Sequence, residues 1–177
     1  FGLDRTVTSG IVSALARAAE GISDFSFFIQ TDAAINPGNS GGALVSMDGR
    51  LIGVNTAIFS KSGGSLGIGF AIPADLVAAF VAQARDGRTM FGIPWAGMNG
   101  QPVDADMAEA FGLARPGGIV VSGLHPASPF ARAGVSVGDV VLAVDGQPIN
   151  TPAEMIYRMS VRGLGQSAQV DIKRDGT

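Results

Sequence analysis

Ser40 is the residue whose flanking sequence best fits a reactive nucleophile. It lies in Asn36-Pro37-Gly38-Asn39-Ser40-Gly41-Gly42, where small neighbours would let a substrate carbonyl approach the hydroxyl. A tight backbone there can aim the N–H groups of Gly38 and Ser40 at an oxyanion that develops during nucleophilic attack. Taken alone, Gly-x-Ser-Gly-Gly fits a glycine-rich turn between strands equally well. The choice between the two interpretations therefore depends on the flanking sequence.

A serine nucleophile needs a general base, normally a histidine that is oriented by a carboxylate. The sequence has one histidine, His125, and it follows the nucleophile by 85 positions within a different set of strand-like runs. We interpret it as a solvated loop residue, because the partners of a triad must converge on the nucleophile. Asp32, on a predicted strand entering the Ser40 loop, is interpreted as a local hydrogen-bond acceptor. The chain thus carries a candidate nucleophile without the rest of a triad.

The elements that must position Ser40 are predicted to be β-strands. From Thr6 to Ile72 short apolar or alternating runs are separated by Gly, Pro, Asn and Asp. The clearest hairpin spans residues 43–54, where Asp48-Gly49 can supply the positive φ angles of a tight turn. Residues 75–85 follow a helical spacing, with Asp75 as a cap and Gly87 as the end signal.

A second unit is predicted after a short polar joint at residues 86–89. Strand-like runs at 118–124, 139–144 and 168–173 alternate with helical stretches at 105–111 and 152–161. This pattern predicts an α+β module of about 90 residues. We place the two domains at residues 1–87 and 88–177.

The flanks of Ser40 carry a family resemblance. Residues 31–42 (Thr-Asp-Ala-Ala-Ile-Asn-Pro-Gly-Asn-Ser-Gly-Gly), 67–73 (Gly-Ile-Gly-Phe-Ala-Ile-Pro) and 8–13 (Thr-Ser-Gly-Ile-Val-Ser) resemble trypsin-like serine proteases of the HtrA (Do/Deg) type. The resemblance implies a mainly β protease part, the second half of a chymotrypsin-like double β-barrel. It implies Ser40 as nucleophile and an oxyanion hole at Gly38, Asn39 and Ser40. The histidine and aspartate would come from a first barrel, so we interpret the chain as a fragment that lacks it.

The resemblance also implies a preference for certain substrate side chains. The residue six before the nucleophile, at the base of the specificity pocket in trypsin-like enzymes, is Ala34, so no carboxylate awaits a Lys or Arg side chain. Ile35 and the strand ending at Ile58 would line the pocket and favour a small or medium aliphatic residue. By pattern alone, both fit ordinary strand core equally well. Asn39 replaces the aspartate that activates digestive enzymes, so activation would proceed by loop ordering.

The second unit resembles a PDZ domain. The signature is residues 127–149, Ala-Ser-Pro-Phe-Ala-Arg-Ala-Gly-Val-Ser-Val-Gly-Asp-Val-Val-Leu-Ala-Val-Asp-Gly-Gln-Pro-Ile, in which Ser128 can cap a short helix and Asp145-Gly146 can turn a hairpin. PDZ domains bind an extended peptide as an added strand and hold its carboxylate on backbone N–H groups. The resemblance assigns that loop to Met90-Phe91-Gly92-Ile93. The helix at 152–161 would present Met155 and Met159, although core packing explains either methionine equally well.

Composition excludes several classes of function. The sequence has 177 residues, no cysteine and a formal net charge of -3 without a dense basic run. Disulfides, thiol chemistry and nucleic-acid partners are therefore not expected. No cofactor and no metal site is predicted. No apolar run approaches the roughly 20 residues that span a bilayer.

The resemblance implies a serine endopeptidase of protein quality control in the periplasm or cell envelope. Its partners would be unfolded, misfolded or C-terminally exposed polypeptides, and the full-length protein would form a homotrimer. The fragment alone is expected to be inactive. The alternative is a peptide-binding scaffold, or pseudoprotease, in which the protease-like half is inert.

Overall fold

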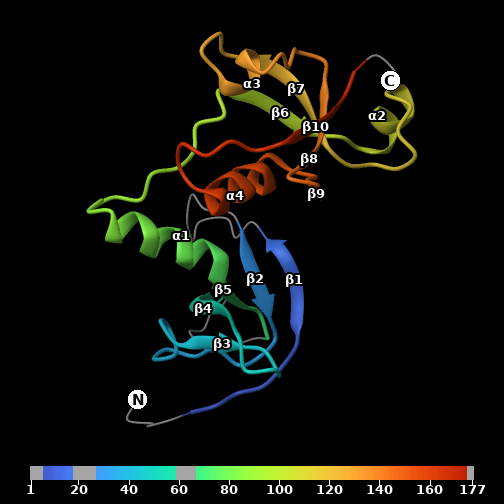
Figure 1. Ribbon diagram of the computed structural model, residues 1–177. Helices are drawn as coiled ribbons and strands as arrows, with labels where there is room; N and C mark the ends of the chain where they lie inside the picture. The colour runs from blue at the N-terminus through green and yellow to red at the C-terminus, as the bar shows by residue number, and fades with distance from the viewer. Residues whose placement is uncertain (1–5, 18–26, 59–66, 175–177) are drawn as a thin grey trace. The chain divides into compact units, whose positions relative to one another are not determined.

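A computed structural model of the protein describes residues 6–17, 27–58 and 67–174 (Figure 1). The chain divides into two structural units, residues 1–90 and 91–177. Each unit contains one antiparallel sheet, as the sequence predicted for a β-rich part followed by an α+β module.

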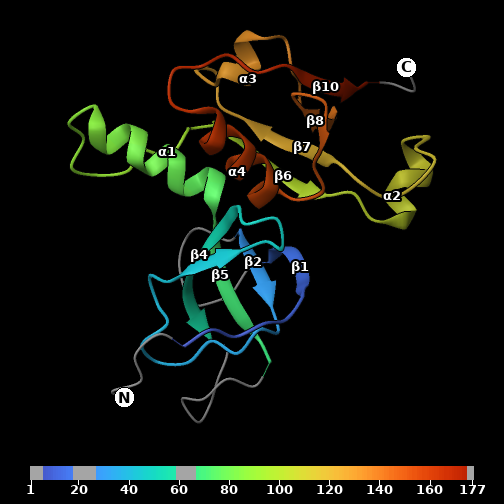
Figure 2. The same ribbon diagram turned by 60° about the horizontal axis from the view of Figure 1, so that its bottom comes forward.

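The first unit is a five-stranded sheet in the order β1-β2-β5-β4-β3, blue to green in Figures 1 and 2. Its strands are β1 (Val12–Arg17), β2 (Phe28–Thr31), β3 (Ala43–Val45), β4 (Leu51–Ile58) and β5 (Gly69–Pro73). Neighbouring strands β3 and β4 form the hairpin expected at residues 43–54. Helix α1 (Ala74–Arg85) follows β5 directly.

The β3–β4 turn differs from the predicted type. Gly49 has a φ of 84°, whereas Asp48 does not have a positive φ. The N–H of Gly49 donates to the Ser46 carbonyl (2.9 Å) and the N–H of Ser46 to the Arg50 carbonyl (2.9 Å). A single left-handed glycine at the fourth position of the turn 46–49 replaces the expected pair of left-handed residues, as in longer hairpin loops.

Helix α1 also begins differently from the prediction. Its N-cap is Pro73, no side chain caps it, and Asp75 lies in the first turn. An acidic residue there still favours the helix, because the N-terminal end of the helix dipole is positive. At the other end Gly87 adopts a φ of 83° and donates to the Ala84 carbonyl (3.0 Å), which confirms it as the end signal.

The second unit has the strand order β10-β8-β7-β6, with β9 paired to β8. The strands are β6 (Met98–Pro102), β7 (Ile119–Leu124), β8 (Val140–Val144), β9 (Gln147–Pro148) and β10 (Val170–Lys173), and the helices are α2 (Ala105–Ala110), α3 (Pro129–Arg132) and α4 (Pro152–Arg162). The turn at Asp145 (φ 50°) and Gly146 (φ 71°) joins β8 to β9 as predicted.

Strand β6 was not predicted, because its sequence, Met-Asn-Gly-Gln-Pro, lacks β-branched and aromatic residues. Tertiary pairing with β7 forms it. A Cβ at Gly100 would lie 2.5 Å from Ile119 Cγ2 and 2.9 Å from the Val120 carbonyl oxygen. A glycine is needed there for the two strands to approach.

The core of the second unit lies between the sheet and its helices. Its buried members are Ala96, Ile119, Val121, Phe130, Val135, Val141, Val144, Ile149 and Met155. They come from segments spread over the whole unit, so the core ties α3, α4 and the central strands together.

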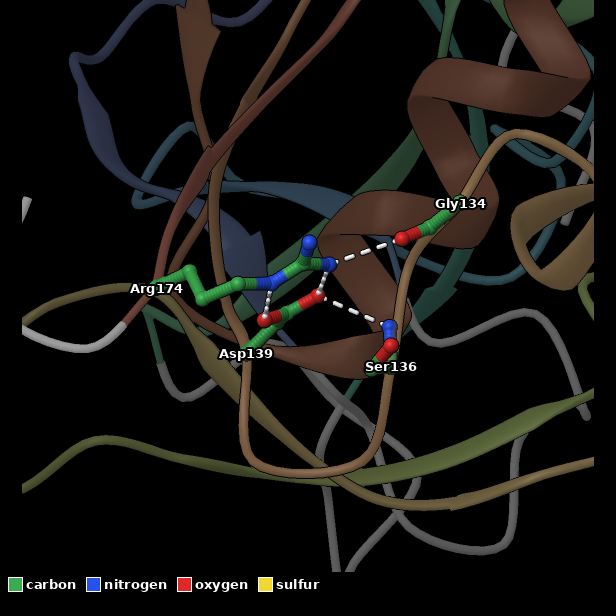
Figure 3. Close-up of polar contacts among 4 residues, drawn as sticks. All are labelled: Gly134, Ser136, Asp139 and Arg174. Carbon is green, nitrogen blue, oxygen red and sulfur yellow. Dashed lines mark hydrogen bonds and ion pairs between the residues drawn. The ribbon is translucent and has the colours of Figure 1, made fainter.

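One polar cluster fastens the last described strand to a loop (Figure 3). Arg174 donates from Nε to Oδ1 of Asp139 (2.7 Å) and from Nη2 to Oδ2 (2.6 Å), and Nη2 also donates to the Gly134 carbonyl (2.7 Å). The Ser136 N–H donates to Oδ2 of Asp139 (2.8 Å). Hydrogen bonds from Arg174 hold the pKa of Asp139 below its usual value, although burial acts in the opposite direction.

Candidate functional site

The strand that enters the Ser40 loop is fastened to the segment before β1. Thr31 is buried and donates from Oγ1 to the Ile11 carbonyl (2.8 Å), while Oδ1 of Asp32 accepts the Ile11 N–H (2.7 Å). Asp32 is therefore an acceptor as predicted, but its partner is 21 residues away in the sequence rather than local. A Cβ at Gly10 would lie 2.3 Å from Oδ1 of Asp32, so residue 10 must be glycine for this contact.

A tight turn precedes the candidate nucleophile. The Asn39 N–H donates to the Asn36 carbonyl (2.9 Å), and Gly38 has a φ of 105°. The Asn39 side chain donates from Nδ2 to the Ala34 carbonyl at 3.4 Å, a long hydrogen bond. The turn thus uses the backbone N–H of Asn39 internally, and only a glycine fits easily at position 38.

Strand β4 holds the segment after Ser40. The Gly41 N–H donates to the Asn55 carbonyl (2.8 Å), and the Asn55 N–H donates to the Gly42 carbonyl (2.9 Å). A Cβ at Gly42 would lie 2.8 Å from the Asn39 carbonyl oxygen. The Gly41-Gly42 pair therefore extends the hairpin ladder toward the turn and fixes where Ser40 stands.

Ser40 itself is exposed, and its Oγ donates to the Thr56 carbonyl (3.2 Å). Within the described part of the chain, neither the Gly38 N–H nor the Ser40 N–H donates a hydrogen bond. Of the three predicted oxyanion-hole residues, Gly38 and Ser40 thus keep an available N–H, whereas that of Asn39 is engaged in the turn. The loop thus presents an exposed hydroxyl and two N–H groups that donate no hydrogen bond within the described residues.

Of the predicted specificity-pocket residues, Ile35 lies against Gly69. Ile35 is buried, and a Cβ at Gly69 would lie 2.7 Å from Ile35 Cδ1. Gly69 is the register partner of Ile58 at the end of β4, but the Ile58 side chain lies outside the part that the structure describes. Ala34 is half-buried, and its carbonyl accepts the Thr8 hydroxyl (3.0 Å).

His125 lies in the second unit and is exposed. Its Nδ1 accepts the Ala127 N–H (3.0 Å) in the turn that leads to α3. A role in a loop turn accounts for this histidine without a catalytic function. Residues 6–17, 27–58 and 67–174 contain no cluster of three or more His, Cys, Asp or Glu that could hold a metal ion. No helix in those ranges is long and apolar enough to cross a membrane.

A cavity of about 460 Å³ opens in the second unit beside α4. Its lining is Ile93, Pro94, Trp95, Pro129, Phe130, Ala133, Val144, Met159, Arg162, Gly163, Leu164, Gly165, Gln166, Ser167, Ala168 and Val170. Of the predicted peptide-binding residues, Ile93 and Met159 line it. Met155 is only 2% exposed and belongs to the core, because it faces the sheet one helical turn earlier.

The other three residues of the predicted carboxylate loop lie outside this lining. Phe91 and Gly92 are half-buried at the start of the second unit, and Met90 is exposed at the end of the first.

Sequence reasoning missed Arg162, the charged residue of the cavity lining. It donates from Nε to the Ser167 carbonyl (3.0 Å), and its Nη1 lies 3.2 Å from Oδ2 of Asp145. A basic residue in the last turn of a helix was the available signal, but it usually indicates only a favourable helix end. The segment 163–168 was missed too, because its glycines and small polar residues resemble any loop.

The two units match two family models. Residues 1–54 match a "Trypsin-like peptidase domain" and residues 64–177 match a "PDZ domain". The second match begins before β5, yet β5 pairs with β2 and β4 in the first sheet. By strand pairing, β5 therefore belongs to the first sheet.

Similar proteins cover the whole chain. It is 44% identical over 177 residues to "Periplasmic pH-dependent serine endoprotease DegQ" of Escherichia coli, covering 99% of this chain and 38% of that protein. It is 44% identical to "Probable periplasmic serine protease do/HhoA-like" of Haemophilus influenzae, with the same two coverages. The solved structure "HtrA-type protease AlgW with tripeptide" superposes with a TM-score of 0.68 at 44% identity, over 100% of this chain and 58% of that one. The chain thus spans less than two fifths of these curated relatives.

Proposed function

The chain belongs to the HtrA (Do/Deg) family of trypsin-like serine proteases with a PDZ domain, and from this premise we propose that it is the nucleophile-bearing and peptide-binding part of a serine endopeptidase. Ser40 is its nucleophile. The observation that carries this proposal is the pair of available N–H groups, on Gly38 and Ser40, beside an exposed Ser40 hydroxyl.

The chemistry follows from that arrangement. Ser40 Oγ attacks the carbonyl carbon of a peptide bond, and its proton passes to a histidine from another part of the full-length protein. The N–H groups of Gly38 and Ser40 stabilise the oxyanion. The histidine returns the proton to the departing amine, and water then hydrolyses the acyl-enzyme ester. For this, Ser40 must first give up its hydrogen bond to the Thr56 carbonyl.

The specificity pocket is proposed to take a small or medium aliphatic side chain. Ala34 places no carboxylate at the pocket base, and Ile35, which lies against Gly69, would supply an apolar wall. The family resemblance assigns Ile58 to the same pocket. Cleavage after Lys or Arg would need a buried acidic partner, which these three positions do not provide.

The second unit is proposed to bind the C-terminal end of unfolded or misfolded polypeptides, either to regulate or to tether them. Met90, Phe91, Gly92 and Ile93 would hold the carboxylate, Met159 would contact the last side chain, and Met155 would support it from the core. Arg162 adds a positive charge to the cavity lining. Relatives named periplasmic support a periplasmic or envelope location, and we propose domains at 1–87 and 88–177 in a homotrimeric full-length protein.

Covalent labelling tests the nucleophile. A fluorophosphonate probe should label the full-length natural protein, and Ser40→Ala should abolish labelling. Ser46→Ala, which removes another hydroxyl from the same unit, is the matched control and should label normally. Equal labelling of the Ser40→Ala protein would contradict the assignment. The 177-residue chain alone should hydrolyse no peptide, since loss of a triad histidine costs about 10⁶ in kcat.

The second candidate is a non-catalytic PDZ scaffold. It is favoured by the hydrogen bond from Ser40 Oγ to the Thr56 carbonyl, which engages the hydroxyl that would otherwise attack. Under this alternative the full-length protein binds peptides but reacts with no fluorophosphonate, so the same experiment separates the two.

A further inference from the structure

The carbonyl oxygen of Ala34 accepts hydrogen bonds from two separate parts of the first unit. Thr8 donates to it from Oγ1 (3.0 Å), and Asn39 donates to it from Nδ2 (3.4 Å). A carbonyl oxygen has two lone pairs, so both bonds can exist together. Thr8 lies 26 residues before Ala34, whereas Asn39 lies five residues after it and directly precedes Ser40. The Ala34 carbonyl thus connects the segment before β1 to the turn that carries the candidate nucleophile.

Asn39 determines how the Ser40 N–H is oriented. Its carbonyl accepts the Gly42 N–H (2.9 Å), and its own N–H donates to the Asn36 carbonyl (2.9 Å). The Asn39 carbonyl and the Ser40 N–H belong to one planar peptide group, so a contact that fixes the carbonyl also fixes the direction of that N–H. The half-buried side chain adds a third bond, to Ala34. Asn39 therefore holds one of the two N–H groups that the proposed oxyanion hole requires.

The segment that carries Thr8 is itself fastened to the chain that precedes Ala34. The Ile11 N–H donates to Oδ1 of Asp32 (2.7 Å), and the Ile11 carbonyl accepts the hydroxyl of the buried Thr31 (2.8 Å). These contacts already bring the two segments together. The Thr8 hydroxyl therefore gives up little further conformational freedom when it binds the Ala34 carbonyl.

The residue type at position 39 determines whether this contact can form. An amide donates an N–H, whereas an ionised carboxylate only accepts and would bring a negative charge against the Ala34 oxygen. Trypsin-like digestive enzymes have an aspartate at this position, which pairs with a new N-terminal ammonium. In this chain neutral hydrogen bonds from Asn39 and Thr8 occur where that ion pair would otherwise act.

We propose that Thr8 and Asn39 are positioning residues for the reaction of Ser40, because together they hold the Ala34 carbonyl and thereby aim the Ser40 N–H at the developing oxyanion. The inference rests on the proposed nucleophilic role of Ser40. Thr8 acts on the reaction only through Ala34 and Asn39. Since the oxyanion develops in the transition state, loss of this positioning lowers kcat and leaves KM nearly unchanged.

Kinetics of the full-length natural protein test this, with a fluorogenic peptide in which valine precedes the cleaved bond. Thr8→Val removes the hydroxyl with little change in shape and should lower kcat about 2- to 10-fold, since one hydrogen bond is lost. Thr8→Ser keeps a hydroxyl and should retain most of kcat. Ser9→Ala removes a neighbouring exposed hydroxyl and should retain all of it. The extent of fluorophosphonate labelling counts the reactive sites, so that kcat is compared per folded molecule.

Asn39→Asp supplies a signature that a purely structural role would not give. At neutral pH the new carboxylate cannot donate, so kcat should fall at least as far as in Thr8→Val. Protonation restores a donor, so the ratio of the variant's kcat to that of the original protein should rise as pH falls toward about 4. Groups that both proteins share, Asp32 and the histidine of the full-length enzyme among them, cancel in this ratio. Combined with Thr8→Val, the substitution should cost less than the product of the two separate losses, since both side chains hold one carbonyl.

The outcomes separate this inference from the function on which it rests. Full kcat in Thr8→Val, an equal loss in Thr8→Ser, a ratio for Asn39→Asp that does not change with pH, or a rise in KM with kcat unchanged would overturn the inference alone, since the original protein still reacts at Ser40. If the original protein neither cleaves the peptide nor reacts with the fluorophosphonate, the proposed function is wrong and the inference is wrong with it.

Discussion

The two units bury apolar surface very differently. Among the described residues of the first unit, the buried cluster consists of Phe28 and Phe70, whose rings lie 5.9 Å apart, with Ile68 and Ile72 packed against them. Ile11 and Leu15 are each 67% exposed. The second unit instead closes a nine-residue core of its own. Among the residues that the structure describes, the candidate nucleophile thus lies in a unit with a small buried cluster, whereas the proposed peptide-binding site lies in a unit with a larger one.

The largest expected effect comes from expressing the units separately. Residues 91–177 should unfold in one cooperative urea transition, whereas residues 1–90 should show no cooperative transition and should bind a hydrophobic dye. Circular dichroism and dye fluorescence measure both. A sharp transition for residues 1–90 at a similar urea concentration would show that the first unit is as stable on its own as the second.

A core truncation in the second unit should have the next largest effect. Ile119 is fully buried in the cluster, so Ile119→Ala should lower the free energy of unfolding by about 2 to 5 kcal/mol. Val137→Ala removes exposed apolar atoms from the same unit and should change it by about 0.5 kcal/mol or less. Urea titration of residues 91–177 gives both values; similar losses would mean that the cluster does not dominate stability.

The buried carboxylate of the second unit should contribute less. Asp139→Asn should cost about 1 to 3 kcal/mol at neutral pH, because it weakens hydrogen bonds from a charged group. The folded-state pKa of Asp139 is lowered, so its contribution is present above the unfolded pKa of about 3.9 and is lost as pH falls through the folded value. Unfolding of both proteins at pH 7 and pH 3 should show a smaller difference at the lower pH. A difference that grows on acidification would contradict this sign.

The smallest effect is expected at the ion pair of the first unit. Arg50 Nε lies 2.6 Å from Oδ2 of Asp48, but both side chains are mostly in solvent. Asp48→Asn should therefore leave thermal unfolding of the 177-residue chain unchanged, since exposed pairs are screened. A shift as large as that of Asp139→Asn would show that the difference in burial between the two carboxylates does not determine their contributions to stability.

Local signals predicted much of the fold. Helix and strand periodicity located α1, α2, α4, β7, β8 and β10, and Ser128 caps α3 as expected, accepting the Phe130 N–H. Strand β6 could not be predicted, since pairing with β7 forms it against the local preference of its residues. Asp75 failed as a cap because β5 runs directly into α1 at Pro73, which places Asp75 inside the first turn.

The candidate site was less accessible to sequence reasoning. Gly38 and Ser40 could be named from residue types, but the use of the Asn39 N–H inside its own turn depends on backbone geometry. Met155 and Met159 share a helix face, and spacing alone cannot say which of them the sheet covers. The positions of Arg162 and Trp95 in a cavity lining could not be predicted, because only the folded chain brings their distant segments together.

The contact between Arg174 and Asp139 has a kinetic consequence. Its partners are 35 residues apart in sequence, so the contact closes a long loop. The conformational entropy lost when that loop closes opposes formation of the contact. Such an interaction is expected to form late on the folding path. Arg174→Gln should then raise the unfolding rate and leave the folding rate almost unchanged, so that the cluster acts mainly on how long the folded domain persists once formed.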